Sequence, residues 1–269
     1  MICELPRTVL SLSPKTGAGA GLGDVVAWLD GLVTNTVRAD AVVFAALLTP
    51  QGKIVADVFV TPDEGRLLLD ATPDMGAELK KRLGMYVLRA PVMVEEVDAR
   101  VFRVWEEEEA DVGHADVGHA DPRHASAGRR VVGGDLVADA TLEAWDAFRL
   151  SLGLPDSQFD FGPTQVFPAD ADMDELGGVD YHKGCFIGQE VVSRMHRMST
   201  VKRRMRAVVL GGEAGAGDVL EAGGRRVGDL LHVRGNMAMA LVRLERLAAA
   251  DTVLSVNGAE AQVMGGPNG

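Results

Sequence analysis

Residues 183–190, with the sequence KGCFIGQE, place one of the two cysteines of the chain where a thiol can react. Lys183 lies two residues before Cys185, and the residues after the cysteine have the pattern of a helix start. A nearby ammonium and the positive end of a helix both favour thiolate over thiol. Glycines at 184 and 188 leave the backbone around the sulfur open to a ligand. The segment therefore predicts a functional thiol at Cys185, with a buried structural cysteine as the alternative.

A charged pair follows the cysteine on the predicted helix. Glu190 and Arg194 are four residues apart, and side chains at this spacing lie on neighbouring turns of one helix face. Because the glutamate is nearer the amino end, the pair also suits the helix dipole. The two side chains are therefore either an ordinary surface pair or a source of directional contacts to a ligand near the helix start.

Basic residues gather after this pair, although the chain as a whole is acidic, with a formal net charge of -12 at pH 7. No acidic residue interrupts the series, which consists of Arg194, Arg197, Lys202, Arg203, Arg204 and Arg206. Such a cluster can bind a nucleic-acid phosphate, the glutamate tail of a ligand or an acidic partner. It can equally be a charged edge strand whose alternate side chains face solvent. Contact of Arg203, Arg204 and Arg206 with tRNA is accordingly one hypothesis.

A duplicated segment within residues 105–130 carries His114, His119 and His124, spaced five residues apart. Interleaved aspartates would allow metal chelation, but the spacing matches neither a helix face nor a structural zinc motif. A solvated surface loop between lobes is the simpler interpretation of residues 113–124. We therefore predict no permanently bound metal, and expect metal only through transient binding by Cys185.

The composition limits the classes of protein to which the chain can belong. It has 269 residues, of which 47% are hydrophobic and 25% charged, enough to fold around a sizeable core. Its two cysteines, of which Cys3 is expected at a flexible terminus, cannot hold an iron–sulfur cluster alone, since four thiolates are the usual requirement. No apolar stretch is long enough to span a membrane, and no Gly-x-Ser-x-Gly hydrolase motif occurs. We therefore expect a soluble protein of a reducing compartment.

The elements that must position these residues alternate between strands and helices. A helix with apolar residues at helical spacing follows Asp24, which we expect to cap it. Two apolar runs on either side of a turn at 49–52 predict a hairpin. The other predicted elements are a strand at 5–12, a strand at 66–70, a helix at 73–83, strands within 87–104, a helix at 137–152, an irregular acidic segment at 157–180 and, from residue 201, short strands separated by glycines. This order predicts an α+β fold with a small C-terminal antiparallel β-barrel.

Several segments resemble the YgfZ family of folate-binding proteins, and together they extend over nearly the whole chain. The octapeptide around Cys185 is the most specific of them. The others are WLDGLVTN at 28–35, LTPQGK at 48–53 with Asp57, DPR at 121–123 with GRR at 128–130, RVG at 226–228 and residues 238–243. Proteins of this family are similar in fold to the T-protein of glycine cleavage, with lobes around a folate channel. The resemblance implies a folate-binding region at 1–200, with one lobe from 1–40 and 130–200 and the other from 41–129, and a barrel at 201–269.

The resemblance also implies a function. It predicts a tetrahydrofolate-binding protein that assists assembly or repair of 4Fe–4S proteins, including tRNA-modifying enzymes, with iron–sulfur carriers or clients as partners. In this interpretation Cys185 is the functional thiol and Lys183 its electrostatic partner. Contacts to folate would come from Glu190, Arg194, Asn35, Gln51 and Asp57. A folate-dependent aminomethyltransferase and a tRNA-binding module are the alternatives, and the compartment would be the bacterial cytoplasm or the mitochondrial matrix.

Overall fold

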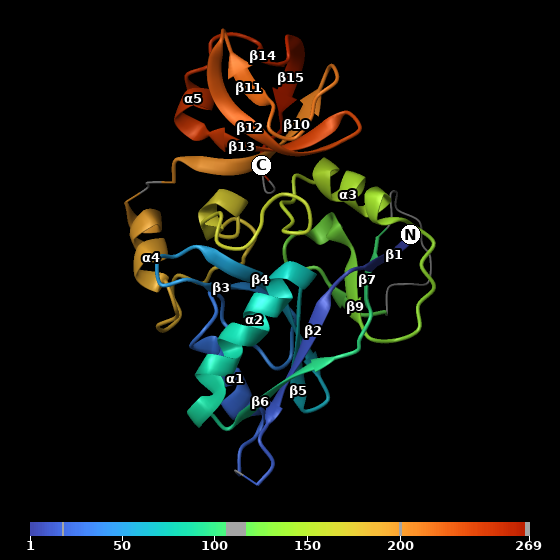
Figure 1. Cartoon of the computed structure of the whole chain (residues 1–269), viewed down its shortest axis with the longest axis vertical. Helices are drawn as coiled ribbons and strands as arrows, with labels where there is room; N and C mark the ends of the chain where they lie inside the picture. The colour runs from blue at the N-terminus through green and yellow to red at the C-terminus, as the bar shows by residue number, and fades with distance from the viewer. Residues whose placement is uncertain (18, 106–116, 199–200, 267–269) are drawn as a thin grey trace.

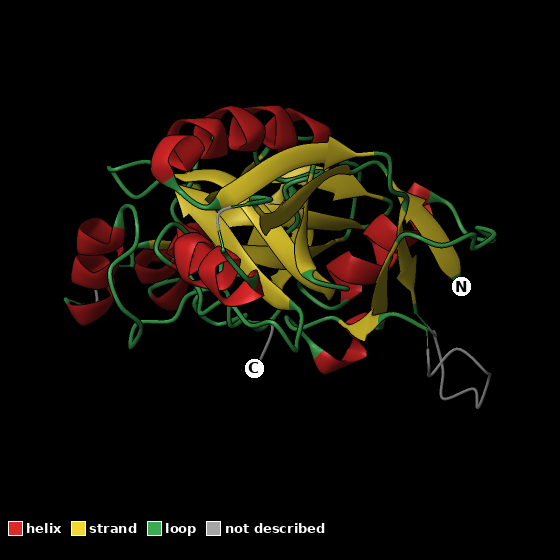
Figure 2. Cartoon of the chain, turned by 90° about the horizontal axis from the view of Figure 1, so that it is seen from below, coloured by secondary structure: helices red, strands yellow, loops and turns green. Residues whose placement is uncertain are grey.

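The computed structural model describes residues 1–17, 19–105, 117–198 and 201–266 of the chain. The strands form two open antiparallel sheets and a closed barrel (Figure 1). Seen from below, the strands lie in the middle of the molecule and most helices lie on the outside (Figure 2). The mixed α+β class and the C-terminal barrel that the sequence predicts are therefore confirmed.

The larger open sheet has five antiparallel strands in the order β3-β4-β5-β2-β6. They are β2 (Thr8–Pro14), β3 (Val43–Leu48), β4 (Ile54–Asp63), β5 (Arg66–Ala71) and β6 (Val92–Val97). The predicted hairpin is confirmed as β3 and β4. Helices α1 (Leu22–Asp30) and α2 (Pro73–Tyr86) pack against this sheet. Both faces of β4 are buried, which explains why most of that strand is apolar.

The smaller open sheet has four strands in the order β1-β7-β9-β8. They are β1 (Ile2–Leu5), β7 (Val101–Val104), β8 (His119–Ala120) and β9 (Arg129–Val132), and helix α3 (Leu142–Ser151) packs against β1. Trp105 and Trp145 meet edge to face, with ring centroids 5.5 Å apart, in the apolar cluster between α3 and the sheet. This aromatic contact fixes α3 against the N-terminal strand.

The barrel stands at the top of Figure 1, above the two open sheets. Its six strands close in the order β10-β13-β12-β11-β14-β15. They are β10 (Arg203–Leu210), β11 (Val219–Ala222), β12 (Arg225–Arg234), β13 (Met237–Arg243), β14 (Leu254–Val256) and β15 (Ala259–Val263), with α4 (Gln189–Arg197) before the barrel and α5 (Leu244–Ala248) after β13. Met205 and Met239 of the barrel belong to the main apolar core of the body. Apolar packing, as well as the chain itself, therefore joins the barrel to the body.

Three predictions about the N-terminal region were wrong in detail. The single strand expected at 5–12 is two strands, β1 and β2, which belong to different sheets. Pro6 lies between them and lacks the N–H that a continuous ladder needs. Cys3 is buried in β1 and not at a flexible terminus, and this burial raises the pKa of its thiol to about 11. Asp24 is not the N-cap of α1, because the helix begins earlier and the Asp24 carboxylate accepts the N–H of Gly21, the N-cap, at 2.8 Å.

The remaining helical turns are short. They are η1 (Val87–Arg89), η2 (Ala125–Ala127) and η3 (Pro168–Ala171). Apart from η3, residues 157–180, all of which the structure describes, form no helix or strand, as predicted. The helix expected at 137–152 begins at Leu142, because the Thr141 hydroxyl caps it by accepting the N–H of Ala144 at 3.2 Å. In the described part of the chain no helix is apolar for the length that crossing a membrane requires. The predicted lobe boundaries within residues 1–200 stay a prediction.

Candidate functional site

The thiol loop, which we define as residues 180–189, joins the body to α4 and carries Cys185 at the surface. Its inner anchor is Lys183, whose side chain is only 2% exposed. The Lys183 ammonium donates to the backbone oxygens of Asp30, Val33 and Asn35, at 2.7, 3.1 and 2.8 Å, and to the Asp30 carboxylate at 3.0 Å. These acceptors lie at and just beyond the carboxyl end of α1, where helix carbonyls lack partners within the helix. Lys183 therefore fastens the thiol loop to the end of α1.

Asp180 fixes the start of the thiol loop. One of its carboxylate oxygens accepts the backbone N–H groups of His182 and Lys183, at 2.8 and 3.2 Å. The other accepts the hydroxyl of Thr36 at 2.6 Å. The Thr36 hydroxyl, together with the two N–H groups, holds the pKa of the Asp180 carboxyl below its usual value. The carboxylate thus stays charged at neutral pH and orders the first turn of the loop.

Close backbone packing fixes the other end of the thiol loop. Gly188 has a φ of 80°, and a Cβ at this position would lie 2.6 Å from the carbonyl oxygen of Thr49 in the β3–β4 turn. Glycine meets both demands, since it adopts positive φ without strain and has no Cβ. A Cβ at Gly52 in the same turn would lie 3.1 Å from Val191 of α4. Cys185 is therefore exposed on a loop that the body holds at both ends.

The immediate surroundings of Cys185 differ from those that we predicted. The first residue of α4 is Gln189, four residues after the cysteine, and the hydrogen bonds of Lys183 are directed to α1. Gly184 is not needed for steric reasons, because no described atom beyond its chain neighbours lies within 4 Å of the place of its Cβ. Instead, the Gln189 amide donates to the Gly184 carbonyl at 3.2 Å and braces the loop. The geometry supports a positioning role for Lys183, while the thiol chemistry of Cys185 stays a prediction.

An open hollow of about 410 Å³ adjoins the thiol loop on the exposed side of α4. It is lined by Tyr181, Gln189, Glu190, Ser193, His196 and Arg197. The rings of Tyr181 and His196 stack with centroids 3.8 Å apart and form part of its wall. Among the described residues, no group of three or more histidine, cysteine, aspartate or glutamate side chains is placed to hold a metal. Within that part of the chain Cys185 offers a single ligand, so any other ligands to a metal must come from outside it.

The structure places the five residues predicted to contact folate in different surroundings. Glu190 and Arg194 form a 2.6 Å ion pair on the surface of α4, with side chains 84% and 61% exposed. Gln51 is exposed in the β3–β4 turn, and both N–H groups of the Asn35 amide donate to backbone oxygens, at 2.9 and 2.6 Å. Asp57, by contrast, is buried on β4. Two of these side chains are paired together, one is committed to the backbone and one is buried, and contact of the five residues with folate stays a prediction.

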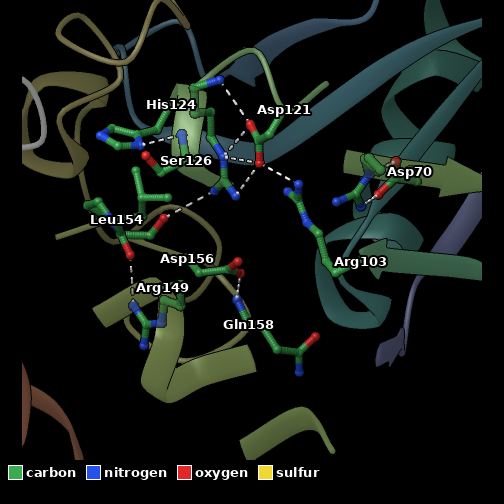
Figure 3. Close-up of polar contacts among 12 residues, drawn as sticks. Asp70, Arg103, Asp121, His124, Ser126, Arg149, Leu154, Asp156 and Gln158 are labelled. Atoms are coloured by element: carbon green, nitrogen blue, oxygen red, sulfur yellow. Dashed lines mark hydrogen bonds and ion pairs between the residues drawn. The ribbon is translucent and has the colours of Figure 1, made fainter. Parts of the chain in front are cut away.

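The buried centre of the body holds a cluster of arginines and aspartates that the sequence reasoning missed. Asp121 lies between the guanidinium groups of Arg103 and Arg123, and Figure 3 shows the Arg103 side chain pointing toward it. Burial opposes the charge of Asp121, but the two arginines outweigh it and hold the pKa of its carboxyl well below the usual value. The DPR segment at 121–123 supplies two members of this cluster, so its role is structural.

A second buried carboxylate in this cluster, that of Asp70 on β5, joins the two open sheets. It accepts hydrogen bonds from Arg7, between β1 and β2, and from Arg130 on β9. Burial again opposes ionisation, and the charges of Arg130 and Arg7 outweigh it and lower the pKa of the carboxyl. The ring of Phe59 lies near three guanidinium groups of the cluster, those of Arg103, Arg123 and Arg130, at 5.2, 4.9 and 4.1 Å from its centroid. The cluster thus ties β4, β5, β7 and β9 together.

Asp57 lies beside this cluster and differs from its other carboxylates. The hydroxyl of Ser157 donates to it, but neither this bond nor the charge of Arg7 outweighs burial, which raises the pKa of the Asp57 carboxyl. A buried carboxyl with a raised pKa can be a proton-transfer group or a merely tolerated polar group. Since it lies on β4 and far from the surface, Asp57 belongs to the interior of the body and not to the thiol loop.

Three of the six basic residues predicted as an anion site, those on β10, are paired with carboxylates of the body. Arg203, Arg204 and Arg206 lie on β10, and carboxylates from residues 170–175 bond them. The pairs are Arg203 with Asp170 at 3.0 Å, Arg204 with Asp172 and Asp174 at 2.9 and 2.8 Å, and Arg206 with Asp172. The acidic segment and the basic strand thus neutralise each other and fasten the barrel to the body. This pairing gives no support to tRNA contact by the three arginines, which stays a prediction.

The histidine-rich segment is described only in part. His114 lies outside the described residues. His119 is on β8, and His124 is the N-cap of η2, where its Nδ1 accepts the N–H of Ser126 at 3.1 Å. His124 therefore has a local structural role.

Comparison with solved structures identifies the fold. The chain aligns with the glycine cleavage system aminomethyltransferase T from Bartonella henselae with a TM-score of 0.76, covering 99% of this chain and 85% of that one. The chain has the fold of that aminomethyltransferase. Residues 202–264 match the family model described as the CAF17 C-terminal beta-barrel domain. The predicted T-protein-like fold is confirmed, but a sequence identity of 15% carries no activity from one protein to the other.

Curated proteins with similar sequences carry the name of an assembly factor. The chain is 28% identical over 242 residues to the mitochondrial iron-sulfur cluster assembly factor IBA57 homolog of Coccidioides immitis, an alignment that covers 76% of this chain and 55% of that protein. It is 28% identical over 276 residues to human mitochondrial iron-sulfur cluster assembly factor IBA57, covering 88% and 78%. The chain thus spans about half the length of the fungal relative. These names agree with the predicted link to iron–sulfur assembly, although they are IBA57 and not YgfZ.

Proposed function

We propose that this protein is an iron–sulfur cluster assembly factor in which Cys185 binds an iron atom of a cluster shared with a partner protein. One observation carries the proposal: the thiol is exposed on a loop whose two ends are fixed by buried contacts. The names of the similar proteins support the same process. The iron here is cargo, because the described residues hold no metal site of their own.

The segments that hold the thiol loop support its importance. Two of the segments that resemble the YgfZ family, at 28–35 and 48–53, come together at the third, which contains Cys185. The first supplies the oxygen acceptors of Lys183, and the second supplies the turn against which Gly188 packs. Three separate stretches of sequence therefore build one structure, and its only exposed sulfur is that of Cys185.

A single thiol requires a second protein for the cluster. Protein-bound clusters usually need four thiolate ligands, and the described chain offers one accessible cysteine. Because Cys185 is exposed, a partner can reach its sulfur from solvent. In this scheme the Cys185 thiolate forms one iron–sulfur bond and the partner's ligands complete the coordination, so that release of the cluster breaks only one bond to this protein.

Folate has no step in this proposal. Asn35, Glu190 and Arg194 already have partners within the protein, and the likeness to the aminomethyltransferase shows the fold alone. Tetrahydrofolate as ligand, tRNA-modifying enzymes as clients and the compartment stay predictions, and the proposal does not depend on them. An aminomethyltransferase would be indicated by turnover of an amine donor with tetrahydrofolate.

The test measures the activity of aconitase, a 4Fe–4S enzyme, in cells that lack this gene and receive a plasmid copy. Wild-type protein, Cys185→Ala and the neighbouring surface variant Ser193→Ala are supplied at matched abundance. We expect wild type and Ser193→Ala to restore activity and Cys185→Ala to fail. Full rescue by Cys185→Ala would remove the thiol from the mechanism. A parallel measurement of thiolated tRNA nucleosides shows whether tRNA-modifying enzymes are among the clients.

A further inference from the structure

The barrel contains a pocket that the thiol mechanism does not use. It has a volume of about 580 Å³ and lies between the β11–β12 turn and the segment that leads from α5 to β14. Its walls are formed by Ala222, Gly223, Arg225, Arg226, Val227, Arg246, Ala249, Ala250, Asp251 and Thr252. Figure 1 shows α5 against the side of the barrel, well separated from the open sheets. This volume falls within the range of ordinary small-molecule sites.

The pocket carries positive charge that the described protein does not neutralise. The Arg225 side chain makes no hydrogen bond or ion pair with any described residue and is exposed at the start of β12. Arg246 donates to the backbone oxygen of Arg226 at 2.8 Å, a bond that orients its guanidinium without cancelling its charge. Arg226 itself is paired with Asp229. Two of the three guanidinium groups are therefore available to an anion, in a protein whose formal net charge is -12.

The backbone and the small side chains leave the space open. The turn between β11 and β12 consists of Gly223 and Gly224, whose φ values of 55° and 74° suit a two-residue hairpin turn. Three alanines form apolar parts of the wall, and because their side chains are small they leave space for a ligand next to the arginines. Asp251 and Thr252 add one carboxylate and one hydroxyl to the rim. No aromatic side chain lines the pocket, which argues against recognition by stacking of a nucleobase.

We propose that this pocket binds a small molecule that carries a phosphate or carboxylate group, held by Arg225 and Arg246. The planar guanidinium of arginine matches both oxyanions and bonds them in pairs. Asp251 can accept a hydrogen bond from a hydroxyl or amine on the same ligand, which separates this site from a simple patch of positive charge. The site lies in the barrel and does not depend on Cys185.

The test is isothermal titration of the full chain with pyrophosphate and, separately, with citrate, so that the two oxyanion classes are distinguished. We expect saturable binding of at least one probe that weakens as salt rises. The double variant Arg225→Gln/Arg246→Gln should lose at least about tenfold in affinity, since each lost charge-assisted contact exceeds 1 kcal/mol. Arg89→Gln is the matched control, because Arg89 is an exposed arginine on η1.

Each outcome decides the proposal. Binding by wild type and Arg89→Gln that is lost in the double variant supports it. Absence of saturable binding to wild type, or equal affinity in the double variant, overturns it. Circular dichroism of the double variant confirms that the barrel is folded, and we expect no change because both side chains are exposed. Cys185→Ala protein should bind the probe as wild type does, so failure of the proposed cluster function and failure of this site are separable.

Discussion

Replacing Lys183 with methionine tests whether this residue acts on the structure of the thiol loop or on the thiol. The change keeps most of the buried volume but removes an ammonium that bonds four oxygen atoms of residues 30, 33 and 35. Removal of one partner from a buried ion pair costs about 3–5 kcal/mol. Asp30 is 32% exposed and keeps its bond from the N–H of Val37 at 2.9 Å, so water and that bond offset part of the loss. We therefore expect the lower end, about 3 kcal/mol of lost stability.

The assay is urea unfolding followed by circular dichroism, with Lys80→Met as control. Lys80 pairs with Glu96 at 2.9 Å, but both side chains are about half exposed, at 50% and 51%, so the control should lose less than about 1 kcal/mol. The alkylation rate of Cys185 by iodoacetamide is measured on the folded variant. A Lys183→Met protein as stable as wild type, with much slower alkylation, would refute the structural role and restore the electrostatic one.

Three further predictions concern the rest of the scaffold. Gly188→Ala should lower stability by about 1–3 kcal/mol in urea unfolding, because positive φ is combined with a contact to the Thr49 carbonyl; a shift within error would show that the turn can move away. Asp121→Asn should cost about 3–5 kcal/mol by leaving buried arginine charge uncompensated, and an unchanged urea midpoint would contradict that. Since the folded-state pKa values of Asp70 and Asp121 are lowered, their stabilisation is complete above the unfolded value near pH 4 and is lost as pH falls through the folded-state values. In thermal melts the melting temperature should therefore fall less with acid for Asp121→Asn than for wild type, and an equal fall would contradict this.

Local patterns in the sequence predicted the elements better than the contacts between them. The β3–β4 hairpin followed from two apolar runs and the turn at 49–52, and the barrel followed from short strands separated by glycines. The role of Lys183 could not follow in this way, because its acceptors lie about 150 positions earlier in the chain. The Lys183 ammonium bonds oxygens of residues 30, 33 and 35, and its electrostatic effect on Cys185, which their proximity in sequence suggested, stays a prediction.

The burial of several arginines could not be predicted from the sequence for a related reason. Arginine is rarely fully buried without a partner, so composition and spacing alone assign it to the surface. Arg103 and Arg130 are nevertheless only 1% and 2% exposed, because Asp121, which follows β8, and Asp70, on β5, pair with them. On β10 the basic run looked like an anion site for the same reason, whereas its partners come from residues 170–175. Charge pairing across the fold, and not local spacing, decides which cations are free.

Two of the residues expected to bind folate lie in the segments that converge at the thiol loop. Asn35 and Gln51 belong to the two segments that hold the loop, and Asn35 contributes its backbone oxygen to Lys183 while its amide bonds the backbone. The resemblance at these positions thus includes residues that hold the thiol loop. Because the loop is fixed at both ends, it is already ordered, with its sulfur exposed, before a partner binds. This order reduces the entropy cost of binding a cluster held by that partner. Distant segments of the chain are thus needed to hold Cys185 in place, and its thiol chemistry stays a prediction.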